Sequence, residues 1–112
     1  MDIYYKSKQI EKICNRSQVA IAKLGSIMAK KLQQRMAELK AADVLSDISH
    51  LPPARLHELE GGRNGELAVD LKHPFRLVFQ LAEFRKGSII DRTKVTSIII
   101  LEVINYHGKQ KK

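Results

Sequence analysis

A dispersed set of polar side chains in this sequence could carry out acid–base chemistry. His57 and Arg76 lie in segments with strand-like patterns, Arg63 lies in a glycine-rich turn between them, and the triplet Asn105–His107 follows the most apolar stretch of the chain. Two histidines and an arginine suit RNA cleavage by the RNA's own 2′-hydroxyl, which needs a base, an acid for the leaving 5′-oxygen and a cation for the charge at phosphorus. Histidine titrates near neutrality, so either histidine can fill either proton-transfer role. A tyrosine beside one of them, Tyr106, could stack on a base or bond to a phosphate.

Each of these residues also has an ordinary structural interpretation. A single histidine such as His57 on a strand is more often a surface or hydrogen-bonded side chain. Arg76 could form a cross-strand ion pair with Asp70 or Glu58, and Tyr106 could be a half-buried core residue. From composition and spacing alone, the sequence predicts a basic α+β domain that can bind RNA.

Other familiar chemical motifs are missing from the sequence. It contains no phosphate-binding loop, no dinucleotide fingerprint and no nucleophile elbow, and "HELEG" lacks the second histidine of a zinc protease. The four histidines, at positions 50, 57, 73 and 107, have no metal-ligand spacing. Cys14 is the only cysteine, which rules out an intramolecular disulfide, and we expect it to be a small buried hydrophobe. We therefore expect neither a metal nor a cofactor.

Length and charge limit the class of protein. The 112 residues fit one domain, residues 1–112, and the net charge is +8. Residues 1–54 hold nine Lys/Arg against five Asp/Glu, and residues 55–112 hold eleven against seven, so the basicity belongs to the whole domain. Such an excess favours polyanionic partners, although solubility alone is the simpler explanation. No stretch is apolar enough to span a membrane and none reads as a signal peptide, so we expect a cytoplasmic protein.

The first half of the chain has helical patterns after a short strand. We predict a strand at residues 2–5, a helical turn at 8–15, and a long helix that begins at an N-cap, Ser17. A short helix is predicted at residues 43–48, before the helix-breaking Pro52–Pro53 pair. The long helix has an apolar stripe at Ala20, Leu24, Ile27, Met28, Leu32, Met36 and Leu39. Its predicted solvated face consists of Lys23, Lys30, Lys31, Gln34 and Arg35.

The second half alternates with a period of two. Strands are predicted at residues 54–60, 66–72, 75–82 and 95–104, with a hairpin turn at 61–65 and a polar loop at 83–94. This order predicts an α+β fold with the long and the short helix on one face of a small, largely antiparallel sheet of four to five strands. The last strand would be a rigid mount for the triplet that follows it, and residues 105–112 would form the active-site end and a basic tail. Strands of one small sheet can bring distant side chains within several ångströms.

Two stretches of the sequence together resemble a known family. "LPPARLHELEGGRNGELAVDLKHPFRLVFQ", followed after a loop by "IIILEVINYH", is similar to the HigB branch of the RelE/ParE superfamily, the toxins of bacterial type II toxin–antitoxin systems. The shared pattern is a leucine-histidine strand, a G-x-R hairpin, an alternating strand, an aromatic-Arg strand and a terminal Tyr-His pair. The resemblance implies a compact RelE-like fold and a ribosome-dependent endoribonuclease, or mRNA interferase, that cuts mRNA in the ribosomal A site and inhibits translation.

The resemblance also assigns roles by position. His57 matches the family's strand histidine, Arg76 its phosphate-stabilising arginine, and Tyr106 and His107 its terminal pair, so these four are the expected catalytic residues. Asn105, an expected substrate-binding residue, stands where many relatives have aspartate.

One further position departs from the family pattern. Glu60 stands where relatives often carry lysine, and an anion beside a scissile phosphate would weaken phosphate binding. Arg63 or Arg55 would then supply the missing positive charge in the substrate-binding set.

The expected partners follow from the same resemblance. They are a cognate antitoxin of the helix-turn-helix, HigA-like kind, the ribosome with its mRNA, and operator DNA only through the antitoxin complex. Two alternatives remain open: a non-nuclease, ParE-like toxin that inhibits DNA gyrase, and a decayed toxin that acts as a binding or regulatory protein. The terminal Tyr106–His107 pair favours the nuclease, and Glu60 slightly favours the ParE-like alternative.

Overall fold

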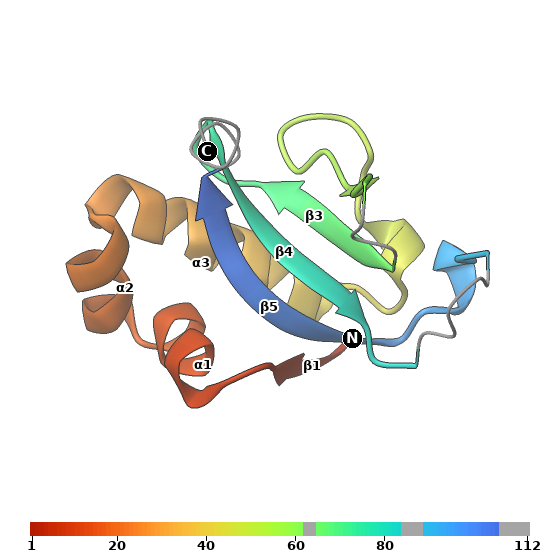
Figure 1. The fold of residues 1–112 in the computed structure, drawn as a ribbon, viewed down its shortest axis with the longest axis horizontal. Helices are drawn as coiled ribbons and strands as arrows, with labels where there is room; N and C mark the ends of the chain where they lie inside the picture. Colours follow the sequence, from red (N-terminus) through yellow and green to blue (C-terminus); the bar gives the residue numbers. More distant parts are fainter. Residues whose placement is uncertain (62–64, 84–88, 106–112) are drawn as a thin grey trace.

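Three helices lie on one side of a five-stranded mixed sheet in the computed structural model, which describes residues 1–61, 65–83 and 89–105 (Figure 1). The helices are α1 (Lys8–Asn15), α2 (Ser17–Leu24) and α3 (Ser26–Ala41), with two 3₁₀ helices, η1 (Leu45–Asp47) and η2 (Arg92–Lys94). The strands are β1 (Asp2–Tyr5), β2 (His57–Glu58), β3 (Glu66–Asp70), β4 (Phe75–Leu81) and β5 (Ser97–Asn105). The predicted α+β fold is confirmed, and the arrangement is consistent with a RelE-like architecture. None of the described helices is long and apolar enough to cross a membrane.

The sheet has the order β1-β5-β4-β3-β2. Strands β2 to β5 pair antiparallel, whereas β1 pairs parallel to β5, with Ile3 opposite Ile98. A register shift interrupts the β4–β5 ladder between Val78 and Phe79. The long strand β5 therefore occupies the interior of the sheet, between β1 and β4.

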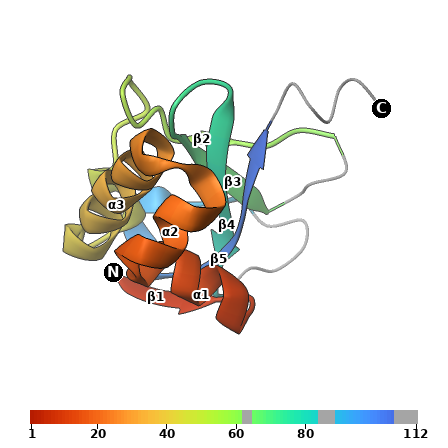
Figure 2. The ribbon, with the colours of Figure 1, turned by 90° about the vertical axis from the view of Figure 1, so that its left-hand side faces the viewer.

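The hydrophobic core lies between the helices and the sheet, as the alternating strand patterns predict (Figure 2). Leu67 and Val69 of β3 lie opposite Phe79 and Leu77 of β4, and all four side chains are buried. They share a cluster with Leu32, Met36 and Leu39 of α3. Cys14 is buried in the same cluster, which confirms the expectation for this residue, and burial raises the pKa of its thiol to about 12.

The prediction of a single long helix from Ser17 is wrong, because the helix is interrupted at Gly25. Gly25 has φ 84° and ψ 161°, a conformation that is essentially restricted to glycine, and it separates α2 from α3. Ile27, assigned to the buried stripe, is 63% exposed because the break rotates the helix that follows. Ser17 is the first residue of α2 rather than its cap, while Ser7 caps α1 by accepting a hydrogen bond from the Ile10 N–H at 3.2 Å.

Arg35 is the second correction in the helical half. It was assigned to a solvated face, but its side chain is only 2% exposed. Its Nε–H donates to the backbone oxygen of Asp70 at 2.8 Å, and its guanidinium lies 3.2 Å from Glu38. A buried guanidinium needs partners of this kind, so Arg35 ties α3 to the end of β3.

Two predicted elements are shorter than expected. The helix predicted at residues 43–48 is the three-residue η1, and the strand predicted at 54–60 pairs only at His57 and Glu58. The chain before β2 is held instead by irregular backbone contacts, in which the Leu56 N–H donates to Ser49 and the Asp70 N–H donates to Ala54. This irregular segment carries Arg55 to the edge of the sheet.

Candidate functional site

The strand register places the candidate residues on the sheet face opposite the helices, which we call the polar face although Ala68 and Val78 at its centre are buried. His57, Ala68, Val78 and Glu102 lie in one row across β2, β3, β4 and β5. Two residues along β3, Asp70 lies opposite Arg76, which in turn lies opposite Ile104. Because side chains two apart on a strand share a face, His57, Asp70 and Arg76 all belong to the polar face.

The protonation of His57 depends on its burial and on the charged groups around it. The pKa of His57 is lowered from its ordinary value, chiefly because burial disfavours the charged imidazolium. The positive charges of Arg55 and Arg76 act in the same direction, whereas the hydrogen bond to the Arg55 carbonyl and the charge of Asp70 oppose them. The balance favours a neutral imidazole near pH 7, the protonation state that a base requires.

Asp70 holds Arg55 in a two-point ion pair beside this histidine. The Arg55 Nε–H donates to one carboxylate oxygen of Asp70 at 2.6 Å, and the Nη2–H donates to the other at 3.0 Å. Arg55 was expected to contact the substrate, and the structural alternative for Arg76 was an ion pair with Asp70 or Glu58. The Asp70 carboxylate binds Arg55 and Glu58 lies 3.9 Å from Arg92, while the pairing of Arg76 stays a prediction.

Arg55 in turn contacts His57 through its backbone. The Arg55 carbonyl oxygen lies 2.7 Å from His57 Nδ1. A carbonyl can only accept, so in the neutral imidazole the proton belongs on Nδ1 and the lone pair on Nε2. Nε2 is buried and has no hydrogen-bond partner among the described residues. A substrate hydroxyl can reach this nitrogen only if the side chains that cover it shift.

A pocket of about 380 Å³ opens next to the ion pair. Two arginines, a histidine and a half-buried phenylalanine line it, together with the paired aspartate: Arg55, Asp70, Leu71, His73, Pro74, Phe75 and Arg76. Guanidinium groups suit phosphate, and an aromatic ring suits a base. Sequence reasoning assigned His73 no function. Its position two residues before the strand that carries Arg76 was the available signal.

The remaining predicted site residues are only partly placed. Asn105 is exposed at the end of β5, where it lies opposite Phe75 of the pocket wall. Arg63, Tyr106 and His107 lie outside the described residues, so their convergence with His57 and Arg76 stays a prediction. Among the described residues, no group of three or more His, Cys, Asp or Glu side chains could hold a metal ion.

No protein-family model matches the chain, and no curated protein matches it significantly. The case for a function therefore rests on the residues and their geometry.

Proposed function

We propose that this protein is a ribosome-dependent mRNA endonuclease of the HigB-like type, the toxin of a type II toxin–antitoxin pair. The observation that carries the proposal is the placement of His57 and Arg76 on one face of the sheet, beside a pocket that Arg55 and Arg76 line. Burial lowers the pKa of the His57 imidazole there, and the charges of Arg55 and Arg76 act in the same direction. The net charge of +8 supports docking on ribosomal RNA.

In this proposal His57 is the general base. Its Nε2 lone pair takes the proton of the RNA 2′-hydroxyl, and the 2′-oxygen attacks the adjacent phosphorus. The 5′-oxygen leaves with a proton from His107, which gives a 2′,3′-cyclic phosphate and a free 5′-hydroxyl. Arg76 stabilises the charge that develops on the phosphoryl oxygens, and Tyr106 orients or stacks the substrate.

The pocket beside Arg76 would receive the nucleotide next to the scissile bond. Its volume of about 380 Å³ lies within the range of small-ligand pockets. The Asp70 carboxylate in its wall opposes phosphate binding less than a free carboxylate would, because Arg55 neutralises it at two points. Arg55 remains partly exposed and can contribute positive charge to the same pocket.

The proposal includes partners and a compartment. A cytoplasmic toxin of this kind needs a cognate antitoxin, of the helix-turn-helix, HigA-like class, whose acidic segment would cover the basic surface. Binding to operator DNA would then occur only through the toxin–antitoxin complex.

Mapping mRNA cleavage in a reconstituted translation system tests the proposal. Purified protein should cut mRNA only when ribosomes are present, and His57→Ala and Arg76→Ala should each lower the cleavage rate at least about 100-fold. His50→Ala and Lys94→Ala are matched controls, because both side chains are exposed and neither lines the pocket. Intact mRNA in the presence of active wild-type protein and translating ribosomes would refute a nuclease.

One observation favours the non-nuclease alternative. The buried Nε2 of His57 is not accessible in the described conformation, which a purely binding toxin tolerates and a base does not. If the wild-type protein arrests growth while mRNA stays intact, a DNA gyrase supercoiling assay tests the ParE-like activity. Harmless expression without any antitoxin would instead indicate a decayed toxin that serves as a binding or regulatory protein.

A further inference from the structure

Asp70 is the most highly connected polar residue of the polar face among the contacts described above. Its backbone oxygen accepts from the buried Arg35 at 2.8 Å, and its N–H donates to the Ala54 oxygen at 2.8 Å. Its carboxylate holds Arg55 at 2.6 and 3.0 Å. Asp70 is therefore fixed from the helix layer on one side, and it fixes Arg55 on the other.

Arg55 has a backbone conformation that requires such support. Its φ is 50°, in the left-handed region that side-chain-bearing residues adopt only at an energetic cost. The Arg55 N–H donates to the Leu51 oxygen at 3.0 Å and the Leu56 N–H to the Ser49 oxygen at 2.9 Å, and the ion pair with Asp70 adds a side-chain restraint to these backbone bonds. If Arg55 relaxed to negative φ, its carbonyl would turn with the peptide plane. That same carbonyl is the group 2.7 Å from His57 Nδ1.

We propose that Asp70 is a positioning residue: by holding Arg55 in the left-handed conformation, it keeps the Arg55 carbonyl on Nδ1 of His57 and so leaves the lone pair on Nε2. Asp70 acts through Arg55 and transfers no proton itself. A contribution of Asp70 to catalysis rests on the proposed nuclease function. The effect of Asp70 on the tautomer of His57 is independent of that function. The two can therefore be tested separately.

The experiment must distinguish the effect of the Asp70 charge on His57 from the effect of the Asp70–Arg55 contact. Asp70 also acts on His57 through space, so Asp70→Asn removes one negative charge and one of the two oxygens that accept from Arg55, which turns the two-point ion pair into a neutral contact of one acceptor at most. Glu66→Gln is the matched control, because Glu66 lies on the same strand and the same face and loses the same charge. Arg55→Ala is the second variant, since it removes the ion pair while leaving the Asp70 carboxylate in place.

The test is nitrogen-15 NMR of the intact protein with labelled histidine, recorded at about pH 8, where the imidazole is neutral. In the wild type and in Glu66→Gln, His57 should show a protonated Nδ1 and an unprotonated Nε2. In Asp70→Asn and Arg55→Ala the ratio of the two tautomers should shift toward protonated Nε2 by about five-fold, the value of one ordinary hydrogen bond. The double variant should shift no further than either single variant, because both changes break the same link.

The outcomes separate the two proposals. If Asp70→Asn and Arg55→Ala both keep Nδ1 fully protonated, Asp70 does not set the tautomer and the inference is overturned. If Asp70→Asn fails to fold, Arg55→Ala decides, because the Arg35 contact to the Asp70 backbone is still available there. If the tautomer shifts as expected but the wild type cuts no RNA, the inference stands and the nuclease proposal fails. If the wild type is a nuclease, Asp70→Asn should lower kcat with little change in KM, while Glu66→Gln changes neither.

Discussion

The face of the sheet that packs on the helices is apolar along β3 and β4, whereas the opposite face carries Asp70, Arg76 and, on β2, His57. Leu67, Phe79 and their neighbours act through the volume they fill, so another apolar side chain of similar size could replace any one of them. The polar face depends on single atoms, such as the Arg55 carbonyl on His57 Nδ1. Arg35 connects the two, since it starts in the helix layer and ends at the Asp70 backbone.

The largest expected effect is a difference in the free energy of unfolding between substitutions on the two faces of the sheet. Phe79→Ala on the helix face should lower the free energy of unfolding by about 3–5 kcal/mol, because it removes a fully buried ring and leaves a cavity. Gln80→Ala, the next residue on the same strand but on the polar face, should cost less than about 1 kcal/mol. Urea unfolding of both variants measures the difference. Equal losses would mean that Gln80 contributes as much to packing as Phe79 does.

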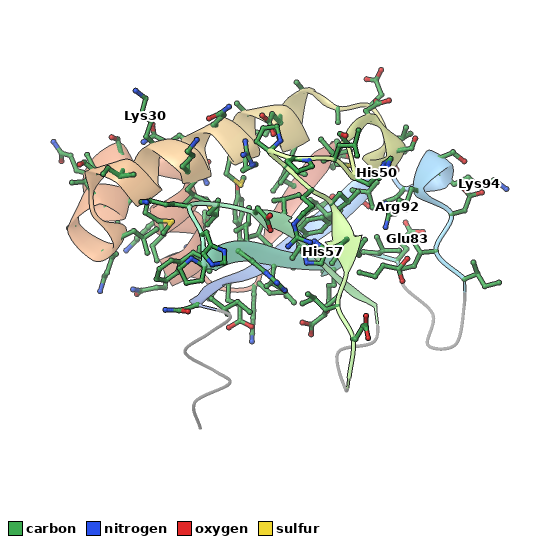
Figure 3. The ribbon with its side chains drawn as sticks, turned by 90° about the horizontal axis from the view of Figure 1, so that it is seen from above. Lys30, His50, His57, Glu83, Arg92 and Lys94 are labelled. Atoms are coloured by element: carbon green, nitrogen blue, oxygen red, sulfur yellow. The ribbon has the colours of Figure 1, made fainter. Side chains whose placement is uncertain are left out.

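A smaller loss is expected where Arg35 crosses between the layers. Arg35→Met keeps an apolar stem but removes the donor to the Asp70 oxygen, and it should lower the free energy of unfolding by about 2–4 kcal/mol. Lys30→Met is the control, since Lys30 points outward from the same helix, away from the sheet (Figure 3). Lys30→Met should change stability by less than about 0.5 kcal/mol. Similar changes in the free energy of unfolding for the two variants would mean that Arg35 behaves as a solvent-exposed residue.

The smallest effect is a dependence of stability on pH that originates at His57. The pKa of His57 is below its ordinary value of 6.5 in the folded chain, so the unfolded chain binds the proton more tightly. The contribution of His57 to the free energy of unfolding is therefore fully present above about pH 6.5, and it is lost as the pH falls toward the pKa of His57 in the folded chain. Comparing urea midpoints at about pH 7.5 and pH 5.5 should show a larger drop for the wild type than for His57→Gln. His50→Gln, which changes an exposed histidine, should follow the wild type; parallel curves for wild type and His57→Gln would contradict the assigned direction.

Strands β3 and β4 could be predicted because burial of one face leaves a period of two in the sequence. The break at Gly25 could not, because the residues on both sides keep helical propensity and a lone glycine is often tolerated inside a helix. The burial of Arg35 was missed for a related reason: a charged residue in a helical pattern usually marks the solvated face. The parallel pairing of β1 with β5 leaves no local signal, since it joins segments about 95 residues apart.

Part of the candidate site was also within reach of the sequence. The placement of His57 and Arg76 on one face follows from alternation and strand order. The Asp70–Arg55 pair does not, because Arg55 lies in an irregular segment whose positive φ no pattern predicts. His73 was passed over because a histidine beside a proline in a turn looks like ordinary loop composition.

Gly25 also affects how the chain could associate with itself. Residues 17–41 would form one continuous helix if position 25 took helical dihedral angles in place of its φ of 84°. In such a rod, α1, α2 and β1 would be carried away from their own sheet, and the edge of β5 that pairs with β1 would be left open. A second copy could then fill that edge with its own β1 and receive the first in return, an exchange of identical elements between two chains. The turn at Gly25 thus lets the first 24 residues pack on the sheet of their own molecule.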